Sequence, residues 1–286
     1  MGWRRASITT ALLGVLGMMT SVTVAKAPVE HTLTFTQATR AIDDGTDRAV
    51  IVAHRGNGCG GEENSMPAFQ QCLGAGVRVM ETDVRYTRDS VPILMHDQNL
   101  WRTTDCFGAV RELTYTELQE CRLADGSQVP RLEEVLRTYA GRLVFDLDMK
   151  EARLDPVAEI IERTGTYSST YLHVFGPEHF VQAKTVQERY PRLRLMPSIR
   201  DEKELEMARV NGFRYRVAEV PQGTDPALIK MLIGAGVTVQ SRIRNPFYQC
   251  ASYARMRHSG IGIIQTDAPL VLLDTCVDPT AHARFK

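Results

Sequence analysis

Short runs of β-branched and other apolar residues alternate along the chain with longer stretches whose apolar positions recur at helical spacing. The short runs predict strands at residues 50–53, 77–84, 143–149, 170–174, 193–197, 215–218, 237–240 and 261–265. The longer stretches predict helices at residues 65–73, 155–163, 177–190, 201–211, 225–233 and 246–258, several of which open on Ser, Asp or Pro. This alternation is typical of repeated βα units and a parallel sheet.

Eight strands with helices between them favour one closed α/β barrel of the TIM (β/α)8 type over an open doubly wound sheet. The loop after the first strand reads "HRGNGCGG" and lacks the G-x-G-x-x-G spacing of a dinucleotide-binding turn. The longest interval, residues 85–142, contains the short run "VPILMHD" and two more helical patterns at 116–123 and 132–140. No repeat of fixed short period and no low-complexity linker divides the chain, so we expect a single domain that covers residues 28–286.

Residues 1–27 have the layout of a secretory signal peptide. Arg4 and Arg5 precede an apolar run that ends in Ala25-Lys26-Ala27, and cleavage is expected after Ala27. A membrane anchor is the alternative, but the apolar run at 11–19 is shorter than the roughly 20 residues that a spanning helix needs. We therefore expect a secreted or periplasmic protein with no stable membrane anchor.

Charge and cysteine content narrow the class of protein further. Removing the leader takes away three basic residues and no acid, which leaves 31 Lys and Arg against 34 Asp and Glu. No basic stripe is present, so a nucleic-acid partner is not expected. Six cysteines in an exported chain predict up to three disulfides of open connectivity, and the zinc-site alternative lacks C-x-x-C or paired Cys/His spacing.

The segment "VRVMETDV" combines apolar and acidic residues on one strand face, because Val77, Val79, Glu81 and Asp83 alternate along it. In a barrel the carboxyl ends of the strands open on the catalytic mouth, so both acids are expected there. Two carboxylates about 7 Å apart along a strand repel unless a cation lies between them, and oxygen ligands suit Ca²⁺ or Mg²⁺. A solvated acidic pair is the alternative, which the apolar half of the same face disfavours.

The segment "LVFDLDMK" repeats this arrangement. Asp146, Asp148 and Lys150 share the inward face, so Asp148 is expected as a third metal ligand at the same mouth. Lys150 stands one step further out, where it pairs with the acids or grips a substrate anion. Asp146 lies deeper, behind the predicted ligands.

Two histidines, His54 and His96, each follow a short apolar run and are expected at the rim of the barrel. A single rim histidine is more often a hydrogen-bonded surface residue, but two that converge with three acids and Arg55 indicate a site for an anionic phosphodiester. A metal ion and Arg55 would neutralise the phosphate oxygens, one histidine would deprotonate the nucleophile, and the other would protonate the leaving oxygen. Glu63 and Asn64 would brace Arg55 or bind substrate, and the loop glycines would let the backbone approach the phosphate.

Eight motifs in this order resemble the glycerophosphodiester phosphodiesterases: "HRG", "EN" before a helix that ends in Gly-Ala-Gly, "ETDV", "VPILMHDQNLWRTTDCFG", "LTYTELQE", "VPRLEEVL", "DLDMK" and "GIGIIQTDAP". Together they span about residues 49–270. The resemblance implies a TIM barrel with a small insertion after the second strand. It also implies roles for residues already singled out: metal ligands (Glu81, Asp83, Asp148), acid and base (His54, His96) and phosphate contacts (Arg55, Lys150).

The resemblance leaves the substrate open. Members of the family usually carry Glu where this chain has Asp148, and the related sphingomyelinase D toxins are similar to it in having Asp there. Hydrolysis of glycerophosphodiesters to glycerol 3-phosphate and an alcohol is the first expectation, and the alternative is a lysophospholipase D acting on lysophospholipids or lysoplasmalogens. The non-enzyme alternative is a secreted barrel that binds phosphate or lipid. Rim aromatics are candidates for contact with an acyl or alkenyl chain or for helix packing, namely Phe107, Phe175, Phe247 and Tyr248. We expect a monomer.

Overall fold

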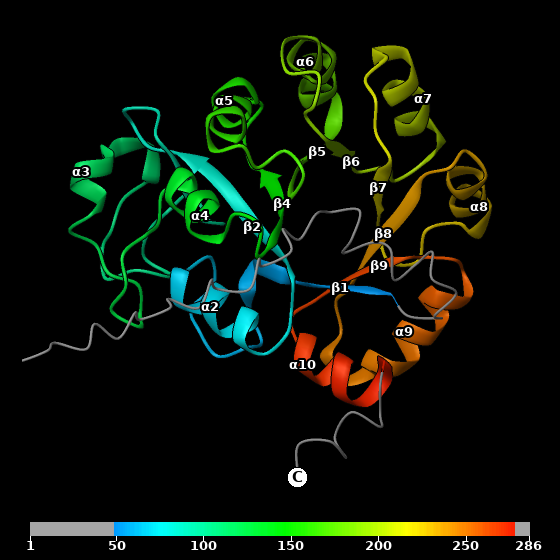
Figure 1. The fold of residues 1–286 in the computed structure, drawn as a ribbon, viewed down its shortest axis with the longest axis horizontal. Coiled ribbons are helices and arrows are strands. Elements are labelled where there is room, and N and C mark those ends of the chain that lie inside the picture. Colours follow the sequence, from blue (N-terminus) through cyan, green and yellow to red (C-terminus); the bar gives the residue numbers. More distant parts are fainter. Residues whose placement is uncertain (1–48, 278–286) are drawn as a thin grey trace, which may run out of the picture. The chain divides into compact units, whose positions relative to one another are not determined.

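The computed structural model describes residues 49–277, so the predicted signal peptide lies outside the described residues. Eight parallel strands form a ring with helices around it (Figure 1). Single bridges join Leu195 to Tyr215 and Ser198 to Glu219, which nearly closes the ring and confirms the predicted TIM barrel. The strand order is β6 (Leu195–Pro197), β5 (Thr170–Val174), β4 (Val144–Met149), β2 (Val79–Tyr86), β1 (Val50–Ala53), β9 (Ile263–Thr266), β8 (Thr238–Ile243) and β7 (Val217–Val220).

Several helices begin at residues that the sequence marks as caps. The Ser65 hydroxyl accepts a hydrogen bond from the Ala68 N–H at 3.1 Å, and the Asp201 carboxylate accepts one from the Glu204 N–H at 2.9 Å. None of the described helices is long and apolar enough to span a bilayer. The helices are α2 (Met66–Gly74), α4 (Leu132–Tyr139), α5 (Asp155–Thr164), α6 (Gly176–Arg189), α7 (Glu202–Asn211), α8 (Pro226–Gly234), α9 (Gln249–His258) and α10 (Pro269–Leu272).

Two apolar layers hold the barrel together. The outer layer lies between strands and helices, where the Phe69 ring meets Tyr139 and Phe145 edge to face. The prediction that Val77 faces inward is wrong, because β2 begins only at Val79 and Val77 packs in the outer layer. The inner layer consists of residues that alternate with the outer set: Val50, Val52, Val79, Val144, Tyr171, Met196, Val217 and Ile263.

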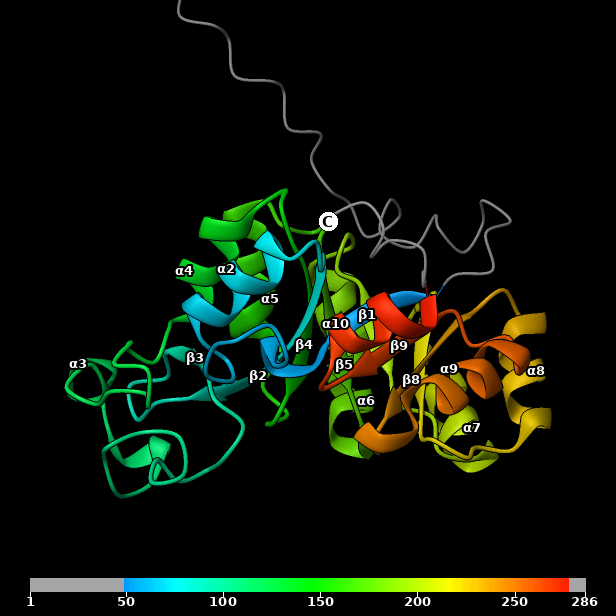
Figure 2. The same ribbon diagram turned by 90° about the horizontal axis from the view of Figure 1, so that it is seen from below.

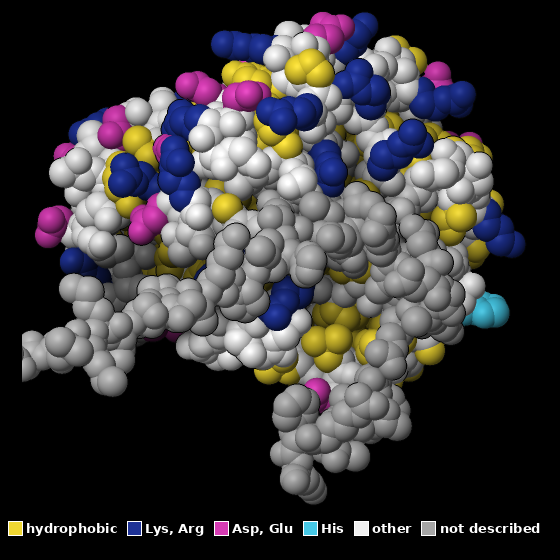
Figure 3. All heavy atoms as spheres, in the orientation of Figure 1, with side chains coloured by type: hydrophobic (Ala, Val, Ile, Leu, Met, Phe, Trp, Pro, Cys, Tyr) yellow, Lys and Arg dark blue, Asp and Glu magenta, His cyan; other side chains and the backbone are white. Residues whose placement is uncertain are grey.

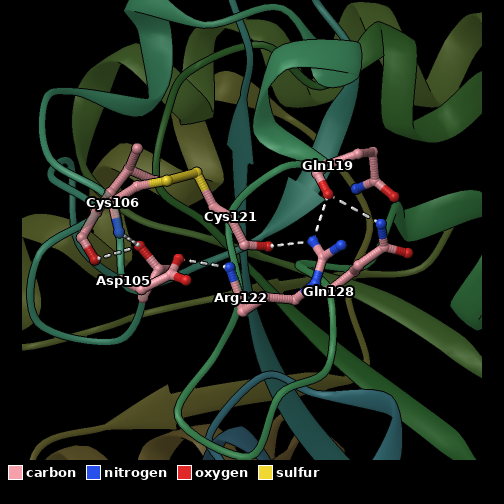
Figure 4. The surroundings of a disulfide bond; sticks show 8 residues. Asp105, Cys106, Gln119, Cys121, Arg122 and Gln128 are labelled. Carbon is pink, nitrogen blue, oxygen red and sulfur yellow. Dashed lines mark hydrogen bonds between the residues drawn. A yellow bond between two sulfur atoms is a disulfide. The ribbon is translucent and has the colours of Figure 1, made fainter.

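The predicted insertion lies between β2 and α4 and is seen to one side of the barrel in Figure 2. Its strand β3 (Pro92–Leu94) pairs antiparallel with the end of β2, and its residues form a hydrophobic cluster of their own. The helix predicted at 116–123 is shorter, α3 (Tyr115–Leu118). It ends early because Cys121 forms a disulfide with Cys106 and the Arg122 guanidinium binds the carbonyls of Gln119 and Cys121 (Figure 4).

All six cysteines are paired, as Cys59–Cys72, Cys106–Cys121 and Cys250–Cys276. The first disulfide ties the loop after β1 to α2, and the third ties α9 to the segment after α10. The predicted set of three disulfides is therefore present, with a connectivity that spacing alone did not give.

One face of the protein carries mixed charge. In Figure 3, Lys and Arg side chains are interspersed with Asp and Glu over the outer helices. The described surface on this face therefore presents both signs of charge side by side.

Candidate active site

Three carboxylates meet at the carboxyl ends of β2 and β4. The two strands pair in parallel with Glu81 opposite Asp146 and Asp83 opposite Asp148. One oxygen atom from each of Glu81, Asp83 and Asp148 lies within 4.8 Å of the other two. Strand alternation and strand register together therefore bring the three predicted acids into one group, and Glu81 and Asp83 are buried within it.

The positive charge of Lys150 offsets part of the electrostatic repulsion within this group of three acids. Burial raises the pKa of Glu81 well above its usual range, and the charges of Asp83 and Asp148 raise it further. The Lys150 ammonium nitrogen lies 2.7 Å from Asp83 Oδ1 and 2.6 Å from Asp148 Oδ2. Burial opposes ionisation of Asp148, but the Lys150 charge outweighs it and lowers the pKa of this carboxyl. The group is thus arranged around positive charge.

The donor atoms of the three acids fit a divalent cation. All are carboxylate oxygens, which suit Ca²⁺ or Mg²⁺, and Asp148 Oδ1 is buried without a hydrogen-bond partner among the described residues. A second cluster contains Asp105, Cys106 and Cys121, but both of its sulfurs are bonded to each other and are not thiolates. Within residues 49–277, the three acids are therefore the group that can hold such an ion.

His54 lies in a single helical turn directly after β1, where Asp267 orients its ring. His54 Nδ1 lies 2.5 Å from Asp267 Oδ1, and His54 Nε2 lies 3.7 Å from Glu81 Oε2. Burial lowers the pKa of His54 below its usual value, although the hydrogen bond to Asp267 opposes this. The neutral ring is therefore favoured, with Nε2 directed toward the acids.

Asp267 was not assigned a role from the sequence. It follows β9, which pairs in parallel with β1 so that Ala53 lies opposite Thr266. Burial opposes its ionisation, but the hydrogen bond with His54 and the charge of Arg242 outweigh it and lower the pKa of Asp267 to about 2. The first and last strands must meet before this pair exists, and hydrophobic periodicity does not mark it, although Asp267 stands within the motif "GIGIIQTDAP".

Arg55 connects the glycine-rich loop to the acids. Its backbone N–H donates to Glu81 Oε2 at 2.9 Å, and its Nε lies 3.3 Å from Asp83 Oδ2. Its Nη1 donates to Glu63 at 3.2 Å, so Glu63 braces Arg55 as expected. Arg55 has a φ of 57°, a left-handed conformation that is uncommon for a residue with a side chain. The surrounding bonds hold it there.

Asn64 braces a different residue from the one expected. Its side-chain nitrogen donates to Asp83 Oδ2 at 2.8 Å, and its oxygen accepts from the Thr82 hydroxyl at 2.6 Å and from the Asp83 N–H at 3.1 Å. Only its backbone N–H reaches Arg55, at the carbonyl oxygen. The buried amide uses its oxygen twice and one of its N–H donors within the protein, and it fixes the Asp83 carboxylate.

His96 lies beyond β3 and is joined to the Arg55 loop by a chain of ion pairs. His96 Nδ1 lies 2.6 Å from Asp97 Oδ1, and the other oxygen of Asp97 accepts from Arg102 Nε. Arg102 in turn donates to both oxygens of Glu63, at 2.6 and 3.0 Å. The hydrogen bond from Arg102 lowers the pKa of Asp97 to about 2. Glu63 is therefore the shared partner of Arg55 and Arg102.

Arg85 is a further basic residue at this mouth that the sequence interpretation missed. It follows Asp83 on the same face of β2, and its Nε donates to the His96 carbonyl oxygen at 2.7 Å. The alternation that singled out Glu81 and Asp83 extends to Arg85 and was sufficient to predict its position.

The glycines of the loop have a packing explanation. A side chain at Gly58 would come within 2.5 Å of the Asp267 carbonyl oxygen, and one at Gly61 within 2.6 Å of the Ala68 backbone. These close approaches place the loop against β9 and the start of α2. Glycine is needed here for contacts inside the protein, independently of any phosphate.

Comparison with known proteins places this geometry in context. Residues 54–269 match the model of the "Glycerophosphoryl diester phosphodiesterase family", which is well over half of the chain. The chain is 34% identical over 114 residues to the "Probable glycerophosphodiester phosphodiesterase 2" of Mycobacterium tuberculosis, covering 40% of this chain and 43% of that protein. It is 38% identical over 148 residues to rat glycerophosphodiester phosphodiesterase 1, covering 46% of this chain and 44% of that protein. The chain thus spans about half the length of these relatives.

Solved structures show the same fold. A glycerophosphoryl diester phosphodiesterase from Parabacteroides distasonis superposes with a TM-score of 0.71 at 24% identity, over 89% of this chain and 95% of that one. An Oleispira antarctica phosphodiesterase in complex with the product sn-glycerol-3-phosphate superposes with a TM-score of 0.65 at 19% identity, over 80% of this chain and 96% of that one. With the family match across the barrel and its mouth, the chain belongs to the glycerophosphoryl diester phosphodiesterase family.

Proposed function

We propose that this chain hydrolyses glycerophosphodiesters to glycerol 3-phosphate and an alcohol, with one divalent cation, Ca²⁺ or Mg²⁺, held by Glu81, Asp83 and Asp148. The observation that carries the proposal is the approach of three carboxylates to within 4.8 Å of one another at the carboxyl ends of two barrel strands. Membership of the family and the names of its relatives support the reaction class.

The residues around the acids have complementary tasks in this proposal. The bound cation would supply positive charge that stabilises the phosphoryl oxygens. Arg55 and Lys150 would hold the non-bridging oxygens as charge builds up on them. His54 and His96 each use Nδ1 to bind a carboxylate, which leaves Nε2 to exchange protons with the nucleophile and the leaving oxygen.

Removing either histidine tests the proposal. We expect His54→Ala and His96→Ala to lower kcat by about 10²- to 10⁴-fold, the usual contribution of acid–base groups. The measurement is release of glycerol 3-phosphate from glycerophosphocholine, and His258→Ala on α9, whose side chain is exposed, is the matched control. Full activity in both variants would reject the assignment of the two histidines as acid and base. If the unaltered protein shows no turnover, the hypothesis that remains is a barrel that binds phosphate or lipid without hydrolysing it.

A specific feature favours lysophospholipase D activity as the second candidate. The exposed large aromatic side chains of the described residues lie in the insertion and in the segments after β5 and β8: Trp101 (62% exposed), Phe107 (86%), Phe175 (40%), Phe247 (88%) and Tyr248 (62%). Aromatic rings at a catalytic mouth suit contact with an acyl chain. A higher kcat/KM for lysophosphatidylcholine than for glycerophosphocholine, lost in Phe107→Ser with Phe247→Ser, would establish it, and equal values would exclude it.

We further propose that the chain is exported. The three disulfides support an oxidising compartment, because such bonds are rare where thiols are kept reduced. The layout of residues 1–27 supports secretion or transfer to a periplasm.

A further inference from the structure

A cavity of about 260 Å³ adjoins the candidate site, between the insertion and the barrel. It has room for about nine water molecules at about 30 Å³ each, the size of a small polar head group. Its lining includes Arg85, Gln98, Val110, Arg111, Lys150 and Glu151.

The strand register explains why this cavity begins where the acids end. Arg85 follows Asp83 by two residues on β2, and Lys150 follows Asp148 by two residues at the end of β4. The Lys150 N–H donates to the Val84 carbonyl oxygen, so the pairing of the two strands continues past the acids. Two cations therefore form the next layer outward from the three carboxylates.

The lining of the cavity contains three basic residues and one acidic residue, and the basic residues differ in how far carboxylates neutralise them. Lys150 is already paired with Asp83 and Asp148. Arg111 is exposed and has no hydrogen bond or ion pair with its side chain among the described residues, while Glu151 is the one acid of the lining. Arg85 is held in place through its Nε by the His96 carbonyl. Two guanidinium groups thus face a small space that contains one carboxylate.

We infer that this cavity is a subsite for a substrate substituent that carries an anionic group, such as a carboxylate or a phosphate. Guanidinium groups bind both anions through paired N–H donors, and they repel a quaternary ammonium group. Arg111 and Arg85 then determine specificity, with Lys150 contacting the scissile phosphate next to them. The inference rests on the proposed diesterase function and extends it to the choice of alcohol.

The test uses two diesters that differ only by a carboxylate, glycerophosphoserine and glycerophosphoethanolamine. The expected ratio of their kcat/KM values is about ten in favour of the serine diester. Arg111→Gln should bring this ratio close to one, because it lowers kcat/KM for the serine diester about tenfold. Glu151→Gln should raise the ratio, since it removes the competing carboxylate.

Arg137→Gln on α4, another exposed arginine, is the matched control and should behave as the unmodified protein. A ratio near one in the unmodified protein, or an unchanged ratio in Arg111→Gln, would overturn the subsite while the diesterase proposal stands. If neither diester releases glycerol 3-phosphate, both proposals fail together.

Discussion

At the scale of single residues, Glu63 connects the two halves of the candidate site, because it binds both Arg55 and Arg102. We predict that Glu63→Gln lowers kcat/KM by about tenfold, since both guanidinium groups lose a charged partner and their loops lose a common support. Steady-state kinetics on a glycerophosphodiester measure this. Glu62→Gln is the neighbouring control, and equal losses in the two variants would contradict the proposed linkage.

The ion pair between Asp97 and Arg102 predicts a pH-dependent stability. The pKa of the Asp97 carboxyl is about 2 in the folded state and about 3.9 in the unfolded state. The ion pair therefore stabilises the fold above about pH 4, and this stabilisation disappears as the pH falls through 2. Asp97→Asn should therefore be less stable than the unmodified protein at pH 7, and the difference should vanish toward pH 2. Urea unfolding at several pH values measures it, and a difference that is constant with pH would refute the assignment.

Local patterns predict only part of this site. Alternation along two strands was enough to place Glu81, Asp83 and Asp148 on one face, and the same reasoning reaches Arg85. It does not reach Asp267 or Arg102, because their partners are brought near only by closure of the barrel and by the path of the insertion. Contacts between residues distant in sequence carry no periodic signal.

At the scale of elements, the insertion is held by its own hydrophobic cluster and by the Cys106–Cys121 disulfide. The disulfide closes a span of 15 residues, for which the chain-entropy model gives about 3 kcal/mol of stabilisation. We predict that Cys106→Ser with Cys121→Ser makes the amides of α3 exchange much faster and leaves those of β1 and β9 protected. Hydrogen exchange followed by mass spectrometry measures this, and uniform acceleration across the chain would show that the insertion is not a separate unit.

The same insertion shows where element prediction stops. The eight barrel strands were predicted from their apolar runs, because each is buried on both faces and its run is bounded by turn residues. The helix predicted at 116–123 followed an equally regular pattern but ends at Leu118. A disulfide at Cys121 and a bridge between Thr104 and Leu123 tie the residues after the helix to another part of the insertion, and tertiary contacts override propensity there.

At the scale of the whole molecule, the three disulfides indicate the cellular compartment in which the protein folds. If the protein is exported, its mature form should contain no titratable thiol after denaturation without reductant, since all six cysteines are paired. A thiol assay on protein isolated from its native compartment measures this. Six free thiols in an active protein would contradict the export proposal.

The central claim is that the barrel uses Glu81, Asp83 and Asp148 to hold a divalent cation on which diester hydrolysis depends. Calorimetric titration of chelator-treated protein with Ca²⁺ and Mg²⁺, combined with an assay of glycerol 3-phosphate release, tests it most directly. We predict one binding event that restores turnover, loss of both in Asp148→Asn, and no change in Glu159→Gln on the exposed face of α5. Full turnover by the chelator-treated protein, or unaltered cation binding by Asp148→Asn, would contradict the claim.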